Sequence, residues 1–150
     1  MSSGMHINEN HAPWKASDRF HLLDTASHPN DVYVHHLDTG KNELAEVTTD
    51  GGQGVHGARN PILSPSGKSV AFYTQDPNVV AGDPGEGSIL RNLVTGRSHR
   101  IGTNQAGEPY ELSAAITAVA NDHTVLFQSA ASNVVANDTN DNWDAFVATF

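Results

Sequence analysis

Residues 70–83 read VAFYTQDPNVVAGD, and this stretch recurs as VLFQSAASNVVAND over residues 125–138. Aligned residues are 55 positions apart, as Val125 is from Val70, and seven of the fourteen aligned pairs are identical. Repetition at a fixed period of this length is typical of folds that stack copies of one supersecondary unit. The sequence therefore predicts a repeat architecture and not one irregular domain.

The repeat extends outward from this stretch in both directions. The turn sequence SPSGK at residues 64–68 aligns with VANDH at 119–123, and each lies between two apolar runs. A fainter first copy occupies residues 17–40, where LDTG at 37–40 recurs as LVTG at 93–96. The chain thus contains three copies, and the first is the most divergent.

Each copy is predicted to consist of short strands. In the second copy, apolar and β-branched runs lie near residues 61–64, 70–74, 88–93 and 98–103, separated by Gly, Pro, Asn and Asp. Residues 112–120 are rich in Ala, but their β-branched residues suit a buried strand as well as a helix. Four short strands per copy indicate a blade of a β-propeller.

The second and third copies resemble a known repeat. SPSGKSVAF at residues 64–72, NVVAGD at 78–83 and LVTG at 93–96 are similar to the TolB-like, WD40-like (PD40) β-propeller repeat. The resemblance implies an all-β partial propeller of about three four-stranded blades, in a periplasmic or extracellular protein. Its divisions are a divergent blade at 1–50, a second blade at 51–106 and an incomplete third at 107–150.

The third blade is expected to lack its outer strand. Phe150 aligns with Leu93 and Leu37, so the sequence stops where the fourth strand of that blade would start. Three blades cannot close a propeller, which has about four to eight. Either the chain is a fragment of a larger exported protein, or two copies form a homodimer that completes a six-bladed ring.

Composition limits the partners that the chain is expected to bind. The net charge is −9, from 17 acidic and 8 basic residues, and this excess of negative charge argues against nucleic acid. The chain has no run of eighteen apolar residues, so no membrane insertion is predicted. It also has no cysteine, which removes disulfides and thiolate metal sites.

One loop has the spacing of a calcium site. Asp138, Asn140, Asn142 and Asp144 alternate along the loop that follows the third NVVA segment. Calcium is commonly bound by oxygen ligands from alternate residues of one tight loop. These four residues are the predicted metal ligands, with Ca²⁺ as the candidate cofactor. The alternative is a turn in which Asn and Asp side chains bind the backbone.

Histidine is a second candidate source of metal ligands. The chain has nine histidines, of which His6, His11, His21, His28, His35 and His36 lie in the first copy. Imidazoles bind zinc, manganese and similar ions. However, adjacent residues of a strand face opposite sides, so His35 and His36 cannot bind one ion together. A population of surface histidines is the alternative.

The predicted function is that of a non-enzymatic binding or scaffold module for a protein or glycan ligand. Rigid sheets that carry variable loops are suited to this role. The sequence identifies no catalytic and no cofactor-binding residue. The alternative is the propeller portion of an enzyme, either accessory to a peptidase domain or part of a metal-dependent lyase that uses histidines.

Overall fold

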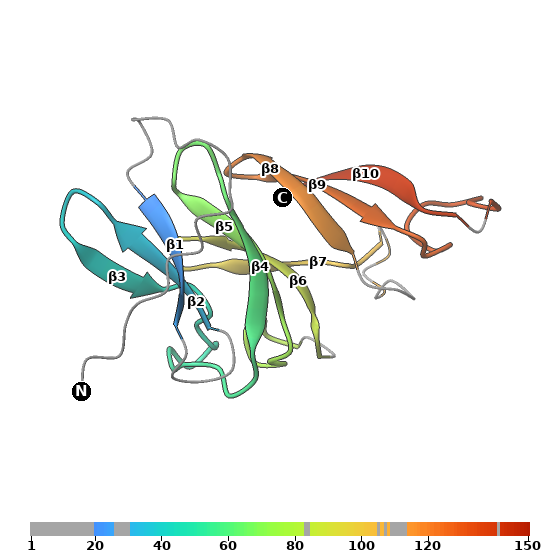
Figure 1. Ribbon diagram of the computed structural model, residues 1–150. Coiled ribbons are helices and arrows are strands. Elements are labelled where there is room, and N and C mark those ends of the chain that lie inside the picture. Colours follow the sequence, from blue (N-terminus) through green and yellow to red (C-terminus); the bar gives the residue numbers. More distant parts are fainter. Residues whose placement is uncertain are drawn as a thin grey trace.

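The computed structural model describes residues 20–25, 31–82, 85–104, 106, 108, 114–140 and 142–150. All ten regular elements in these residues are β-strands. They form three antiparallel sheets, none closed into a barrel, which lie side by side with the four-stranded sheet in the middle (Figure 1). The fold is therefore all-β and has the arrangement of a partial β-propeller.

Sheet 1 contains β1 (Phe20–Thr25), β2 (Asp31–His36) and β3 (Lys41–Leu44), in that order. Sheet 2 contains β4 (Ala58–Leu63), β5 (Ser69–Thr74), β6 (Gly87–Asn92) and β7 (Ser98–Ile101). Sheet 3 contains β8 (Ala115–Asn121), β9 (Thr124–Ser129) and β10 (Asp144–Thr149). Each sheet is a meander in which sequence neighbours pair, as in propeller blades.

The strands agree with the sequence pattern. The four strands of sheet 2 match the four predicted runs to within a few residues. Residues 115–121, for which the sequence left helix and strand open, form the strand β8. In the described residues sheet 3 ends at β10 and sheet 1 also has three strands, so only sheet 2 has all four strands that were predicted for a blade.

Two turns show why the Leu-x-Thr-Gly motif recurs. Gly40 and Gly96 close the hairpins β2–β3 and β6–β7, with φ angles of 69° and 70°. Their N–H groups donate to the carbonyls of His36 and Asn92 at 2.7 and 2.9 Å. Because L side chains rarely adopt this left-handed region, glycine is the residue that these turns require.

The core consists of the two seams between adjacent sheets. At the first seam, Val34 of sheet 1 packs with Phe72 and Ile89 of sheet 2. At the second seam, Leu90 of sheet 2 packs with Phe127 of sheet 3. Consecutive residues of β5 and β6 thus bury opposite faces, and most of both strands is buried. Sheet 2 is therefore covered on both faces.

Polar contacts accompany the apolar packing at the second seam. The Asp122 carboxylate, in the β8–β9 turn, accepts hydrogen bonds from the hydroxyls of Ser64 (2.7 Å) and Ser66. Its backbone carbonyl accepts one from the Ser69 hydroxyl at 3.0 Å. Burial acts to raise the pKa of Asp122, but the serine hydroxyls outweigh it and hold the pKa below its ordinary value. The aligned turns of two repeats are thereby joined.

We predict that Leu90→Ala destabilises the chain by about 2–5 kcal/mol, because it leaves a cavity in the second seam. Leu90 is 1% exposed. Leu37→Ala is the matched control, since Leu37 is 48% exposed in the β2–β3 turn and should change stability by less than about 1 kcal/mol. Urea unfolding of both variants measures the difference, and equal effects would contradict the seam packing.

Candidate functional site

The two ends of the sheets differ in the length of their connections. Because every pairing is antiparallel, alternate connections lie at opposite ends. Short turns at residues 37–40, 64–68, 93–97 and 122–123 form one end, and the ends of β3, β5, β7 and β9, from which the longer connections start, form the other. We call the second the long-loop end. Long loops on a rigid scaffold are where binding residues concentrate.

Asp76 joins two of the long loops at the first seam. Its carboxylate is buried and accepts hydrogen bonds from the N–H groups of Val55 at 2.7 Å, His56 at 3.4 Å and Asn78 at 2.8 Å. Burial acts to raise the pKa of Asp76, but these N–H groups outweigh it and lower the pKa. Asp76 is therefore an ionised acceptor that fixes the β3–β4 connection against the β5–β6 connection.

Glu46 lies beside Asp76 and is fully buried. Its Oε1 accepts a hydrogen bond from the Thr74 hydroxyl, whereas its Oε2 has no hydrogen-bond partner among the described residues. Burial raises the pKa of Glu46 to about 7; the Thr74 hydroxyl opposes this rise, and the charges of Asp31 and Asp76 add to it. This carboxyl group can therefore hold a proton near neutral pH.

Close packing at Gly54 encloses the two carboxyl groups. A Cβ atom at this position would lie 3.1 Å from Oδ2 of Asp76 and 3.3 Å from Cδ of Glu46. Such distances are shorter than ordinary van der Waals contact, so a side chain here would push the carboxyl groups out of place. Gly54 therefore allows the β3–β4 connection to lie directly on the acidic pair.

Asp31 completes a group of three buried carboxyl side chains at this seam, and Gln53 donates to its Oδ2 at 2.6 Å. Among the described residues, no group of three or more His, Cys, Asp or Glu side chains has an arrangement that could hold a metal ion. Of the three, Glu46 is the one whose pKa is raised to about 7. We call Asp31, Glu46 and Asp76 the acidic seam.

The sequence did not single out the acidic seam. Glu46 occupies the repeat position of Gly102, as Ala45 occupies that of Ile101, so the comparison of repeats gave no reason to expect an acid there. The three carboxyl groups come from separate parts of the chain and meet only after two sheets have packed together. The one sequence signal is that an acid, Glu46, lies two residues after the end of β3, where the second copy has Gly102.

A second polar group lies on sheet 2 at the long-loop end. The guanidinium of Arg59 stacks over the Tyr73 ring, with Cζ 4.2 Å from the ring centroid. Hydrogen bonds from Tyr73 and Gln75 lower the pKa of Glu86. The Arg100 guanidinium donates to the Glu86 carbonyl at 2.6 Å. We call these five residues the polar platform.

The backbone beside Arg59 departs from a regular strand. Asn60 has a φ of 55°, and the pairing of β4 with β5 shifts register between Arg59 and Ile62. Bulges of this kind redirect side chains and are common next to functional sites. The bulge places Arg59 and Asn60 exposed on β4, the first strand of sheet 2.

The loop predicted to bind calcium forms turns through its own side chains. Oδ1 of Asn140 accepts a hydrogen bond from the Asn142 N–H at 2.9 Å, and its Nδ2 donates to Oδ2 of Asp144 at the same distance. The Asn140 N–H donates to Oδ1 of Asp138 at 3.4 Å. Hydrogen bonds therefore link the four predicted ligands to one another, and calcium binding stays a prediction.

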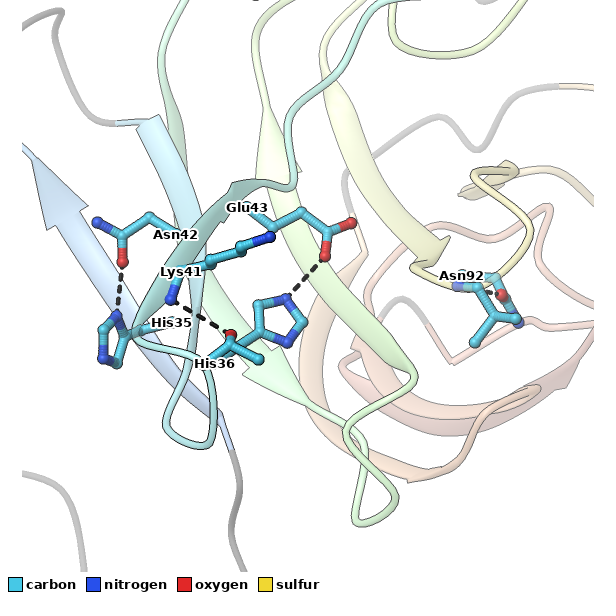
Figure 2. A network of polar contacts seen from close by, with 8 residues as sticks. His35, His36, Lys41, Asn42, Glu43 and Asn92 are labelled. Carbon is cyan, nitrogen blue, oxygen red and sulfur yellow. Dashed lines mark hydrogen bonds and ion pairs between the residues drawn. The ribbon is translucent and has the colours of Figure 1, made fainter.

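The adjacent histidines point to opposite faces of sheet 1, as their positions on a strand predicted (Figure 2). Nδ1 of His35 lies 2.6 Å from Oδ1 of Asn42, and Nε2 of His36 lies 2.9 Å from a carboxylate oxygen of Glu43. Each ring thus contacts the strand β3 separately. The side chains of His6, His11, His21 and His28 lie outside the described residues.

Two comparisons with known proteins found no match. No family model matches the chain, and no curated protein matches it. Within the described residues, the structure has no helix of the length and apolar character needed to cross a membrane.

We predict that Glu46→Gln changes how stability depends on pH. Between its ordinary pKa of 4.5 and the folded value of about 7, Glu46 keeps a proton that the unfolded chain has released. Stability of the wild-type chain therefore falls as pH rises through this window and levels off above it, by about 3 kcal/mol for this group. Glutamine cannot ionise, so the variant gains about this amount relative to wild type between pH 4.5 and 8.

The measurement is urea unfolding of both proteins at several pH values. Asp76 and Asp122, whose pKa values are lowered, stay ionised throughout this range, so the difference between the two proteins reports the proton on Glu46. Glu108→Gln makes the same substitution at an exposed position and is the matched control. A constant difference between wild type and Glu46→Gln from pH 4.5 to 8 would rule out the proton on Glu46.

The calcium prediction is tested by thermal unfolding with and without millimolar Ca²⁺. Binding to the folded state alone raises the unfolding midpoint, and Asp138→Asn with Asp144→Asn should abolish this rise. Mg²⁺ at the same concentration is the control, because it needs a smaller and more regular site. An unfolding midpoint that Ca²⁺ leaves unchanged would show that the loop is an Asx turn only.

Proposed function

We propose that this chain is a non-enzymatic binding and scaffold module, built from propeller blades of the TolB-like kind and belonging to an exported protein. Its ligand is a protein or glycan that contacts the long-loop end. The observation that carries the proposal is the way two long connections are fixed to each other by Asp76. Loops fixed before binding lose less conformational entropy when the ligand arrives.

The polar platform is the part of this end that suits ligand recognition. Arg59 is exposed and is held in place by its stacking on Tyr73. A guanidinium that keeps its geometry offers several N–H donors in fixed directions, which suits carboxylate and hydroxyl oxygens of peptides and glycans. Arginine and tyrosine are also the residues in which binding energy is commonly concentrated.

The proposal predicts saturable binding of this chain to members of peptide and glycan arrays. Arg59→Ala should weaken the affinity for bound members by about tenfold or more, because it removes the central donor of the platform. Titration of the labelled chain against each bound member measures the affinity. Activity assays on the same members would show whether any is converted.

Arg97→Ala is the matched control for this experiment. Arg97 is also exposed, but it lies in the β6–β7 turn at the opposite end of sheet 2. The control should keep wild-type affinity for the array members. Loss of binding in Arg97→Ala but not in Arg59→Ala, or turnover of a bound member, would refute the proposed function.

A further inference from the structure

The two outer sheets of the stack are not equivalent, and sheet 3 leaves one complete face open. Exposed and less exposed residues alternate along β10, whereas most of β6 is buried. On the open face Leu126 is 38% exposed and Val147 is 65% exposed, and the two are cross-strand partners. We call this surface the open face. Its exposed members are Ala115, Leu126, Gln128, Ala145, Val147 and Thr149.

In sheet 2, the residues at the equivalent repeat positions are covered by a neighbouring sheet. Leu126 aligns with Ala71, and Val147 occupies the position on β10 that Leu90 occupies on β6. Ala71 and Leu90 are 0% and 1% exposed, because they pack against sheet 3. The open face is thus the third copy of a surface that, in sheet 2, is buried by the next sheet.

Sheet 1 carries the surface that would fit this face. Tyr33 aligns with Ile89, which is buried, and with Phe146, which is partly buried; these two side chains point back toward the preceding sheet. Tyr33 and Leu44 are cross-strand partners on the outward side of sheet 1, and both are only partly buried. The outward side of sheet 1 therefore presents the repeat positions with which sheet 3 contacts sheet 2.

Charge allows the two surfaces to meet. The chain has a net charge of −9, so most pairs of surfaces from two copies repel each other. The open face has no charged member, and His35, Asn42 and Leu44 beside Tyr33 on sheet 1 carry no carboxylate. The exposed side chains that the structure describes on these two faces therefore place no like charges opposite each other.

We infer that the open face of one copy binds the outward side of sheet 1 of a second copy, so that the seam between sheets 2 and 3 is repeated between molecules. Two such contacts, related by a twofold axis, give six stacked sheets. Six lies within the usual range of propeller blades, about four to eight, so the ring can close. This inference rests on the stacking of blades in the proposed function but not on the ligand.

The test is the mass of the chain in solution, measured by sedimentation over a range of concentrations. Wild type should reach a mass of two chains of 16.0 kDa each and no higher species, because the ring is closed. Val147→Glu places a charge in the contact and should raise the dimer dissociation constant by about tenfold or more. A monomer at every concentration would overturn the inference.

Val94→Glu is the matched control, since Val94 is 71% exposed in the β6–β7 turn. It makes the same change of charge away from the open face and should dimerise as wild type does. Circular dichroism of both variants checks that they remain folded. Equal weakening of the dimer by both variants, or by neither, would exclude the open face as the contact.

Mixing two variants tests the direction of the contact. His35→Glu damages the sheet 1 side and Val147→Glu damages the open face, so each alone should be mainly monomeric. Their mixture retains one intact contact per pair and should form mixed dimers. Failure of the mixture to associate would overturn the head-to-tail arrangement. Array binding by a monomeric variant would show that the proposed function stands without the dimer.

Discussion

The constraint on which this structure depends is that a flat, apolar sheet must be covered on each face that carries large apolar side chains. Strand β6 shows it directly, since Ile89 and Leu90 are neighbours in sequence yet pack on different sheets. A sheet of this kind cannot be stable alone, because burying one face leaves the other in water. The repeat meets this requirement, because the sheet of each copy packs against one face of the sheet before it.

The two seams meet the requirement with different polar chemistry. At the second seam, the serine hydroxyls of one turn donate to Asp122 of the next repeat, which stays ionised. The first seam contains the acidic residue Glu46. Its Oε2 has no hydrogen-bond partner among the described residues, and its pKa is raised to about 7. Apolar packing thus sets the distance between sheets, and the polar groups distinguish one seam from the other.

Much of the fold could be predicted from the sequence, because the information was local and repeated. Turn glycines such as Gly96 and the aligned NVVA segments act over a few residues, and these signals placed the four strands of sheet 2 correctly. The opposite directions of His35 and His36 followed from strand geometry alone. The acidic seam could not be predicted, since it depends on which strand ends meet in space. Glu46 and Asp76 become neighbours only when two sheets pack.

The difference between Glu46 and its repeat counterpart Gly102 has a consequence for how the chain folds. If all repeats presented identical edges, any blade could dock on any other, and chains at high concentration would exchange blades and form open-ended fibres. Here the first seam pairs Glu46 with the Thr74 hydroxyl, whereas the second seam has Gly102 and Ser129 at the corresponding repeat positions. The unlike residues at equivalent positions therefore make the two docking surfaces chemically different, which disfavours assembly of the blades in another order.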